Sequence, residues 1–336
     1  MSRPEKPESR FAGYTILDLI GASHHGTSVY RASKAARPAR LKMITADDAS
    51  FRWRCIDAWC RFSGIDDPNI LVAREMITDR QVAFVSDYAP AISLAEYLAS
   101  GVSVPVNDIV HIVEGIARAL DAGASGGLWH LNLKPTNVLL DGNAHGTPRV
   151  YVTDFGMARQ SWEHISLEVG EILPADLLFI PPECLSIAPH SRSDVYSLGA
   201  IAYSLLGGSN EAAALNPGVM LWAYANGLSL TVLNLEAFDD DVASILASAT
   251  SRIPEERPAS GLEFSTRLAE ALGLKRDEDA TTTAVPVSLV GANGIGDAVP
   301  ANIRYASLFE LFITAAVVTL VSCICTVLVL KLSGLA

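Results

Sequence analysis

Three polar side chains that could take part in a reaction lie close together in one short segment of the chain. The sequence HLNLKPTN at residues 130–137 places an amide at Asn132, a lysine at Lys134 and a second amide at Asn137. An amide offers a carbonyl oxygen for a hydrogen bond, but it has no useful basicity. Asn132 is therefore poorly suited to take a proton from a hydroxyl group.

This segment resembles the catalytic loop of a serine/threonine protein kinase, H-R-D-x-x-x-x-N, with Asn132 at the position of the aspartate. Other kinase-like motifs occur in the family's order: DPNIL at residues 67–71, Lys42 in LKMI, DFG at residues 154–156, PPE at residues 181–183, DVYSLG at residues 194–199 and Arg257 in ERP. Arg257 resembles the arginine that pairs with the glutamate of A-P-E, here Glu183. The resemblance covers about residues 11–272 and is strongest to bacterial eukaryotic-like serine/threonine kinases.

The resemblance implies an α+β, two-lobed protein-kinase-like fold at residues 11–274. The small lobe, rich in strands, would span about residues 11–88, and the helical large lobe about residues 89–274. The residue patterns agree, because strand patterns dominate before helical ones along the chain. Strands are expected at 14–20, 28–32, 40–44 and 81–86, helices at 51–62, 110–120 and 195–206, and a hairpin from 138–140 and 150–152.

The same resemblance implies ATP and Mg²⁺ as cofactors. The residues expected at the nucleotide are Gly21, Gly26, Val29, Lys42, Asp87, Asn137 and Asp154. Of these, Asn137 and Asp154 would also hold Mg²⁺, while Lys134 would neutralise the transferred phosphoryl group. A structural alternative is that Asn137 and Asp154 form a hydrogen-bonded core of the cleft.

Two departures affect the nucleotide side of the site. The phosphate-covering loop keeps Gly21 and Gly26, has Ser23 for the middle glycine and carries one extra residue before Val29. Because glycine lets the backbone approach phosphate closely, this change should weaken or reshape the loop's grip. The family spacing places the glutamate partner of Lys42 at Ala58. Asp57 lies about 100° round the helix from that position, so it either pairs after a register shift or belongs to a solvated face.

Two further departures flank the catalytic loop. Leu131 replaces the arginine that grips a phosphate on the activation segment, which disfavours control by phosphorylation of that segment. Asp176 falls where the family has a threonine that contacts the catalytic aspartate and lysine. One hypothesis is that Asp176 points toward Asn132 and Lys134 and supplies the missing basic oxygen. The favoured interpretation is simpler: Asp176 is a solvated loop acid, because carboxylates are seldom buried without partners.

The two ends of the chain differ in character. Residues 1–10 are polar and charged and are expected to form a disordered tail without a signal peptide. Residues 275–308 have the composition of a flexible linker. The apolar run at 311–330 predicts a transmembrane helix at residues 309–331, followed by a short tail at 332–336, with a buried core helix as the alternative. We therefore expect a single-pass membrane protein with its kinase-like domain in the cytoplasm.

Composition narrows the possible partners. The formal net charge of -12 argues against nucleic acid, and the five cysteines form no C-x-x-C pair, which favours a reducing compartment without structural zinc. The sequence thus predicts a membrane-anchored, ATP/Mg²⁺-binding pseudokinase that acts as a signalling scaffold or regulator through protein partners. The alternative is an active or weakly active serine/threonine kinase that transfers the γ-phosphate of ATP to protein hydroxyl groups.

Overall fold

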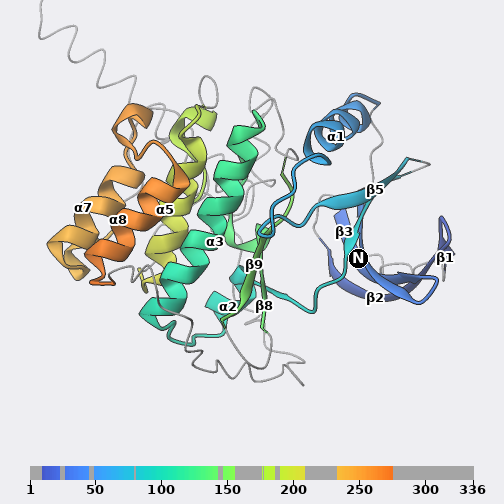
Figure 1. Cartoon of the computed structure of the whole chain (residues 1–336), viewed down its shortest axis with the longest axis horizontal. Coiled ribbons are helices and arrows are strands. Elements are labelled where there is room, and N and C mark those ends of the chain that lie inside the picture. The colour runs from blue at the N-terminus through green and yellow to red at the C-terminus, as the bar shows by residue number, and fades with distance from the viewer. Residues whose placement is uncertain are drawn as a thin grey trace, which may run out of the picture. The chain divides into compact units, whose positions relative to one another are not determined.

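The computed structural model shows two lobes, a small one built on a sheet and a large one built on helices (Figure 1). It describes residues 10–22, 27–44, 49–78, 81–142, 147–155, 176, 178–185, 190–208 and 233–274. The expected two-lobed α+β fold is thereby confirmed over these residues. Gly26 and the rest of the glycine-loop turn, the expected linker, the expected membrane helix and the C-terminal tail lie outside them.

The small lobe is a six-stranded antiparallel sheet in the order β1-β2-β3-β4-β6-β5. Its strands are β1 (Arg10–Phe11), β2 (Tyr14–Ala22), β3 (Thr27–Lys34), β4 (Arg37–Ile44), β5 (Ala73–Thr78) and β6 (Val82–Asp87), and the helix α1 (Ala49–Phe62) accompanies them. The strands and helix expected here are confirmed. Arg10 pairs with Thr15, so the sheet already includes the last residue of the expected tail.

Alternation along β4 decides which side chains face the site. Ala39 and Leu41 are buried in the core on one face of the sheet. The intervening residues Arg40 and Lys42 must point to the opposite face, because successive side chains of a strand alternate. On that face Arg40 is paired in register with Ser86, and Lys42 with Phe84. Arg40, Lys42 and two residues of β6 therefore share one surface.

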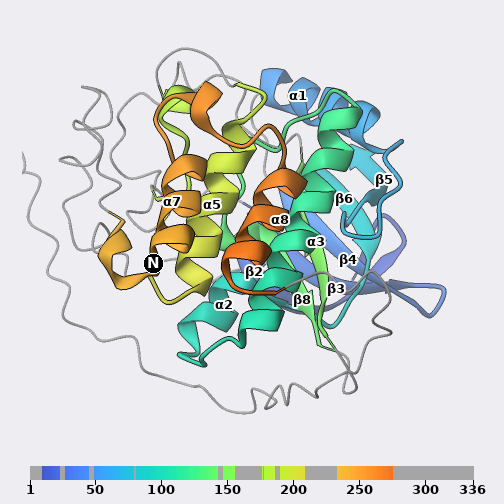
Figure 2. The ribbon, with the colours of Figure 1, turned by 60° about the vertical axis from the view of Figure 1, so that its left-hand side comes forward.

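The large lobe is helical, with a small three-stranded sheet beside α3 (Figures 1 and 2). Its helices are α2 (Leu94–Ala99), α3 (Val106–Ser125), α5 (Ser193–Leu205), α7 (Asp240–Ala249) and α8 (Gly261–Ala271). Short 3₁₀ turns occur at η1 (Pro135–Asn137), η3 (Pro182–Leu185), η5 (Leu235–Ala237) and η6 (Pro254–Glu256), and the strands are β7 (Ile92–Ser93), β8 (Val138–Asp141) and β9 (Arg149–Val152). The two long helices and the β8–β9 hairpin expected from the sequence are confirmed.

Helix α3 fixes the position of the hairpin that carries the site. It buries an apolar stripe at helical spacing that includes Ile109, Ile112, Val113 and Ile116. Gly115 of the same helix lets the backbone of α3 approach β9, since a Cβ there would lie 2.8 Å from Cβ of Val150. The end of β9, directly before Thr153 and Asp154, is therefore held against the core of the large lobe.

Within the described ranges, no helix is long and apolar enough to cross a membrane. The segment predicted to do so, residues 309–331, is not among those ranges. The membrane helix accordingly stays a prediction.

Candidate functional site

The centre of the candidate site is an ion pair between the two lobes. Nζ of Lys42, in β4, lies 2.6 Å from Oδ2 of Asp154, which follows β9. The side chains are only 13% and 17% exposed, respectively. Burial acts to raise the pKa of Asp154, but the positive charges of Lys42 and Arg40 outweigh it and hold the pKa below its ordinary value. Asp154 is therefore a carboxylate whose charge is already compensated by the protein.

Helix α1 supplies no partner for Lys42 through Asp57. Oδ2 of Asp57 lies 2.5 Å from Nη2 of Arg61, one turn later in α1, and the Asp57 side chain is 48% exposed. Of the two interpretations of Asp57, pairing with Lys42 or a place on a solvated helix face, the structure shows the second. The anionic partner of Lys42 is instead Asp154, across the cleft.

The catalytic-loop segment is anchored by Asp194 at the start of α5. The backbone N–H groups of His130 and Leu131 donate to its two carboxylate oxygens, each at 2.7 Å. This clamp holds Leu131 in the left-handed region, with φ of 58°, a conformation that costs a non-glycine residue of the order of 1 kcal/mol. The carboxylate of Asp194 thus fixes the backbone that presents Asn132.

Asn137 ties the loop to the strand that leads to Asp154. Its Nδ2 donates to the carbonyl oxygen of Asn132 at 2.8 Å, and its own carbonyl oxygen accepts from the backbone N–H of Thr153 at 2.9 Å. The side-chain amide of Asn132 makes no hydrogen bond with another residue of the described part of the chain. The structure therefore links Asn132 to Asn137, and Asn137 to Thr153, the residue before Asp154.

Asp176 contacts Lys134. Its Oδ2 lies 2.6 Å from Nζ of Lys134, and the two side chains are 20% and 26% exposed. The favoured interpretation of Asp176 as a solvated loop acid is wrong, because a lysine from the catalytic-loop segment compensates its charge and permits partial burial. The structure thus shows the contact of Asp176 with Lys134 that the alternative hypothesis included, and the role of Asp176 as a base stays a hypothesis.

An aromatic stack connects α1, the residue after Asp154 and the catalytic-loop segment. The rings of Phe62 and Phe155 lie 5.1 Å apart at an angle of 17°, and those of Phe155 and His130 lie 4.7 Å apart. Nε2 of His130 is 2.8 Å from the carbonyl oxygen of Thr153. Phe155 is therefore fixed from both sides, which restricts the position of Asp154 beside it.

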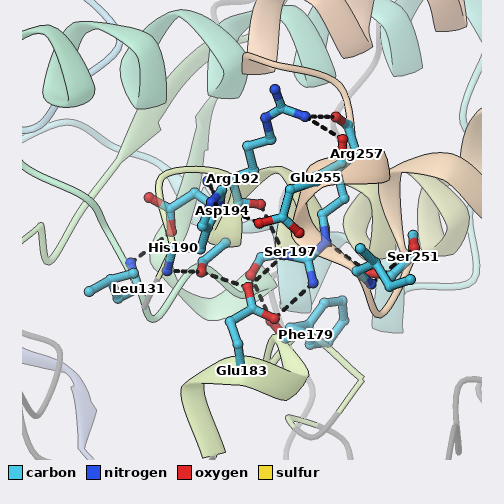
Figure 3. Close-up of polar contacts among 12 residues, drawn as sticks. Leu131, Phe179, Glu183, His190, Arg192, Asp194, Ser197, Ser251, Glu255 and Arg257 are labelled. Carbon is cyan, nitrogen blue, oxygen red and sulfur yellow. Dashed lines mark hydrogen bonds and ion pairs between the residues drawn. The ribbon is translucent and has the colours of Figure 1, made fainter. Parts of the chain in front are cut away.

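The expected pair of Glu183 and Arg257 is confirmed (Figure 3). Arg257 donates from Nη1 and Nη2 to the two oxygens of Glu183, at 2.6 and 2.8 Å, and its side chain is fully buried. Its guanidinium also lies 5.1 Å from the centre of the Tyr196 ring. Burial acts to raise the pKa of Glu183, but hydrogen bonds from Arg257 and Ser193 lower it overall. This two-pronged pair fixes η3 against α5 and η6.

Arg40 is the site residue that the sequence analysis missed. It lines a cavity of about 30 Å³, together with Lys42, Trp59, Phe62, Leu71, Ala73, Phe84, Ser86, Thr153, Asp154 and Phe155. It also stands where the V-A-I-K motif has its alanine. The signal was available, because a residue two positions before Lys42 in a strand shares its face. An arginine at that position adds a second cation to the cleft.

Two nucleotide-site predictions are placed less directly. Gly21 pairs in register with Val29, and Val29 with Lys42, so these residues are neighbours in the sheet. The side chain of Asp87, by contrast, is 60% exposed and forms an ion pair with Arg74 at the far end of β6. Asp87 therefore does not bring its carboxylate to Lys42 and Asp154.

The residues fit a resident Mg²⁺ ion poorly. Asn137 and Asp154 offer oxygen ligands of the type that Mg²⁺ takes. However, Asp154 is bound by Lys42 and lies in the field of Arg40, so an added dication would meet two cations around one carboxylate. In the described ranges no group of three or more His, Cys, Asp or Glu residues could hold a metal ion.

Comparison with known proteins adds a second line of evidence. Residues 17–258 match the family model described as "Protein kinase domain". The chain is 31% identical over 277 residues to serine/threonine-protein kinase PknJ of Mycobacterium tuberculosis, covering 79% of this chain and 46% of PknJ. It is 26% identical over 267 residues to serine/threonine-protein kinase PkaB of Streptomyces coelicolor, covering 77% of this chain and 63% of PkaB. The matches thus span less than two thirds of these relatives.

A solved structure supports the same assignment. The crystal structure of the PknI kinase domain of Mycobacterium tuberculosis, a double mutant, matches with a TM-score of 0.58 and 26% identity. The match covers 78% of this chain and 96% of that domain. The two-lobed arrangement is therefore shared with a bacterial serine/threonine kinase domain.

Proposed function

Because this chain belongs to the protein kinase domain family, we propose that it is a pseudokinase that binds nucleotide and acts as a signalling scaffold or regulator. Members of the family generally use ATP and Mg²⁺ and act on protein substrates. The observation that carries the proposal is Asn132, held at the position of the catalytic base by the Asp194 clamp and by Asn137.

The absence of an aspartate at position 132 removes the proton acceptor and leaves the fold intact. Phosphoryl transfer depends mainly on positioning and charge stabilisation, and general-base help contributes about 10²- to 10⁴-fold. The Asn132 amide can still hold a hydroxyl group by a hydrogen bond, but it cannot accept its proton. The expected result is a domain that keeps the kinase shape and transfers phosphate at most at a trace rate.

The nucleotide part of the proposal rests on Lys42 and its surroundings. Lys42 is a partly buried cation on the cleft face of β4, suited to bind phosphate, and Arg40 adds a second cation beside it. At this same place Lys42 is paired with Asp154, while the α1 residue Asp57 is paired with Arg61.

The scaffold part rests on the rigidity of the large lobe. Arg257 and Glu183 form a buried, two-pronged ion pair, and Asp194 clamps the catalytic-loop backbone. These contacts maintain a defined surface that a signalling protein could recognise whether or not phosphate is transferred. We further propose that residues 309–331 anchor this surface to a membrane, with the kinase-like domain in the cytoplasm. The twenty-residue apolar run supports this part of the proposal.

The alternative, a weakly active kinase, is favoured by one observation. Asp176 brings a carboxylate to Lys134, close in the chain to Asn132. If that carboxylate took the proton, transfer would persist without the usual aspartate. Its pairing with Lys134 opposes this role, because Oδ2 of Asp176 is already occupied by Nζ of Lys134 at 2.6 Å.

The deciding experiment measures transfer of radiolabelled phosphate from ATP by the full chain, purified in mild detergent. Wild type is compared with Asn132→Asp, which restores the carboxylate, and with Lys42→Met, which removes the lysine of the cleft. We expect wild type to match the Lys42→Met background and Asn132→Asp to exceed it. Wild-type transfer well above that background, and lost in Lys42→Met, would establish the weak kinase instead.

Membrane anchoring has its own test. The full chain and a variant with Val318→Arg and Leu320→Arg in the apolar run are expressed separately and extracted with alkaline carbonate. Wild type should stay in the membrane pellet, and the arginine variant should be released, because charges at the centre of a membrane helix are costly. Release of the wild-type chain would contradict the anchor.

A further inference from the structure

Arg40 is a cation in the cleft that acts on Asp154 through its charge. It is partly buried, lines the cavity with Lys42 and Asp154, and makes no hydrogen bond or ion pair with any residue that the structure describes. Its register partner Ser86 lines the same cavity and is 7% exposed, and the Ser86 hydroxyl likewise has no hydrogen-bond partner among those residues. Buried polar groups normally have partners, so both groups point to a ligand.

The charges define what that ligand is. Arg40 and Lys42 contribute two positive charges beside the single negative charge of Asp154, while the nearby Lys134 is balanced by Asp176. This part of the cleft has an excess of positive charge before any metal binds. A guanidinium offers up to five N–H donors in a planar fork that matches phosphate oxygens. An anion with several phosphate oxygens is the complementary ligand.

The same charges remove the need for a metal. A divalent cation in a nucleotide site offsets the repulsion between the phosphates and the site's own carboxylate. Here Lys42 already lies 2.6 Å from Asp154, and Arg40 adds a second fixed cation to the same cavity. A dication entering this place would be repelled by both.

We propose that Arg40 takes the place of the metal ion, so that this cleft binds a nucleoside triphosphate through its phosphates without Mg²⁺. The inference rests on the nucleotide-binding part of the proposed function. Arg40 and Lys42 bind the phosphates, Ser86 donates its hydroxyl hydrogen bond to the bound nucleotide, and Asp154 keeps Lys42 in position. The arrangement holds a nucleotide without the ion that phosphoryl transfer uses.

The test measures ATP binding to the full chain by calorimetry and thermal shift, in EDTA and in excess Mg²⁺. Arg40→Ala removes the extra cation. Arg37→Ala is the matched control, because it removes an arginine from the same strand at an exposed position away from the cavity. Adenosine and inorganic tripolyphosphate are titrated in parallel, to separate recognition of the base from recognition of the phosphates.

We expect wild type and Arg37→Ala to bind ATP in EDTA, with Kd changing less than about threefold on addition of Mg²⁺. Tripolyphosphate should bind and adenosine should not. Arg40→Ala should bind ATP in EDTA roughly tenfold or more weakly, the loss of about one charge-assisted hydrogen bond, and should recover binding in Mg²⁺.

Three results would overturn the inference. They are binding by wild type that requires Mg²⁺, equal or tighter ATP binding by Arg40→Ala in EDTA, and no ATP binding in either condition. The second result would identify Arg40 as a plug that fills the pocket. The first two results overturn only the metal-free inference, whereas the absence of ATP binding in both conditions would also remove the nucleotide-binding part of the proposed function. The transfer assay tests the loss of catalysis independently of all three.

Discussion

Nζ of Lys134 and Oδ2 of Asp176 are 2.6 Å apart, so the lysine that would neutralise a transferred phosphoryl group is already neutralised by the protein. A phosphate that approaches Lys134 must compete with a fixed carboxylate and be repelled by it. Under the proposed pseudokinase function, this pair would weaken a second component of phosphoryl transfer beside Asn132.

Asp176→Asn tests this relationship. The substitution should lower the stability of the domain by about 1 kcal/mol, the loss of a partly exposed ion pair, and should leave phosphate transfer at background. In the Asn132→Asp chain it should raise transfer, because Lys134 becomes free to meet phosphate. Thermal unfolding and the radiolabel assay measure the two effects. A fall in transfer in that chain would assign Asp176 the role of a base.

Arg257→Ala should be strongly destabilising. The change leaves Glu183 as an uncompensated, largely buried carboxylate, and breaking a buried pair in this way costs about 3–5 kcal/mol. Arg267→Ala is the control, because Arg267 is exposed in α8 and its loss should cost less than about 0.5 kcal/mol. Urea unfolding monitored by fluorescence compares them. Equal unfolding midpoints for the two variants would contradict the structural role of the Glu183–Arg257 pair.

Glu183 should make the domain sensitive to acid. Its pKa is lowered in the folded chain below the ordinary value of 4.5, so its contribution to stability is complete above that pH. The contribution is lost as pH falls below 4.5 through the folded pKa, because the unfolded chain takes up the proton first. Glu183→Gln should lack this part of the pH dependence. Melting curves between neutral pH and pH 3 should show the two chains converging in Tm, and a constant difference would refute this origin.

Phe155→Ala should disrupt the aromatic stack and the site together. Phe155 is fully buried between Phe62 and His130, and removal of a buried aromatic ring costs about 3–5 kcal/mol. Phe155→Leu keeps much of the volume and should cost less. ATP binding in EDTA should weaken in Phe155→Leu although the chain stays folded, because Asp154 and hence Lys42 lose their fixed position. Unchanged binding in that variant would show that the stack does not position the cleft.

The parts of the fold that could be predicted depend on local pattern and motif order. Glu183 and Arg257 lie far apart in the sequence, yet each stands in a recognisable motif, so their pairing was predicted and is confirmed. Strand alternation, helical periodicity and the turn after Asp141 likewise predicted the elements that carry Lys42 and Asp154.

The parts that could not be predicted depend on which side chains pair with one another in the folded domain. Lys42 pairs with Asp154, and Asp57 pairs with Arg61. The spacing of these residues in the sequence cannot decide which of the possible ion pairs forms, because each of them is sterically possible. Asp176 was expected in solvent because carboxylates are seldom buried without partners, and the sequence could not decide whether it reaches Lys134. Arg40 was overlooked, although a residue two positions before Lys42 in the same strand must point to the same face of the sheet.

Phe155 follows Asp154 directly in the chain, and its ring is held by Phe62 of the small lobe and His130 of the large one. A ligand that shifts Asp154 must therefore also move the ring of Phe155, which packs against both lobes. Phe62 is the last residue of α1, and the same helix carries the exposed indole of Trp53. A change in the position of Phe155 would therefore be felt in α1 as well as in the catalytic-loop segment.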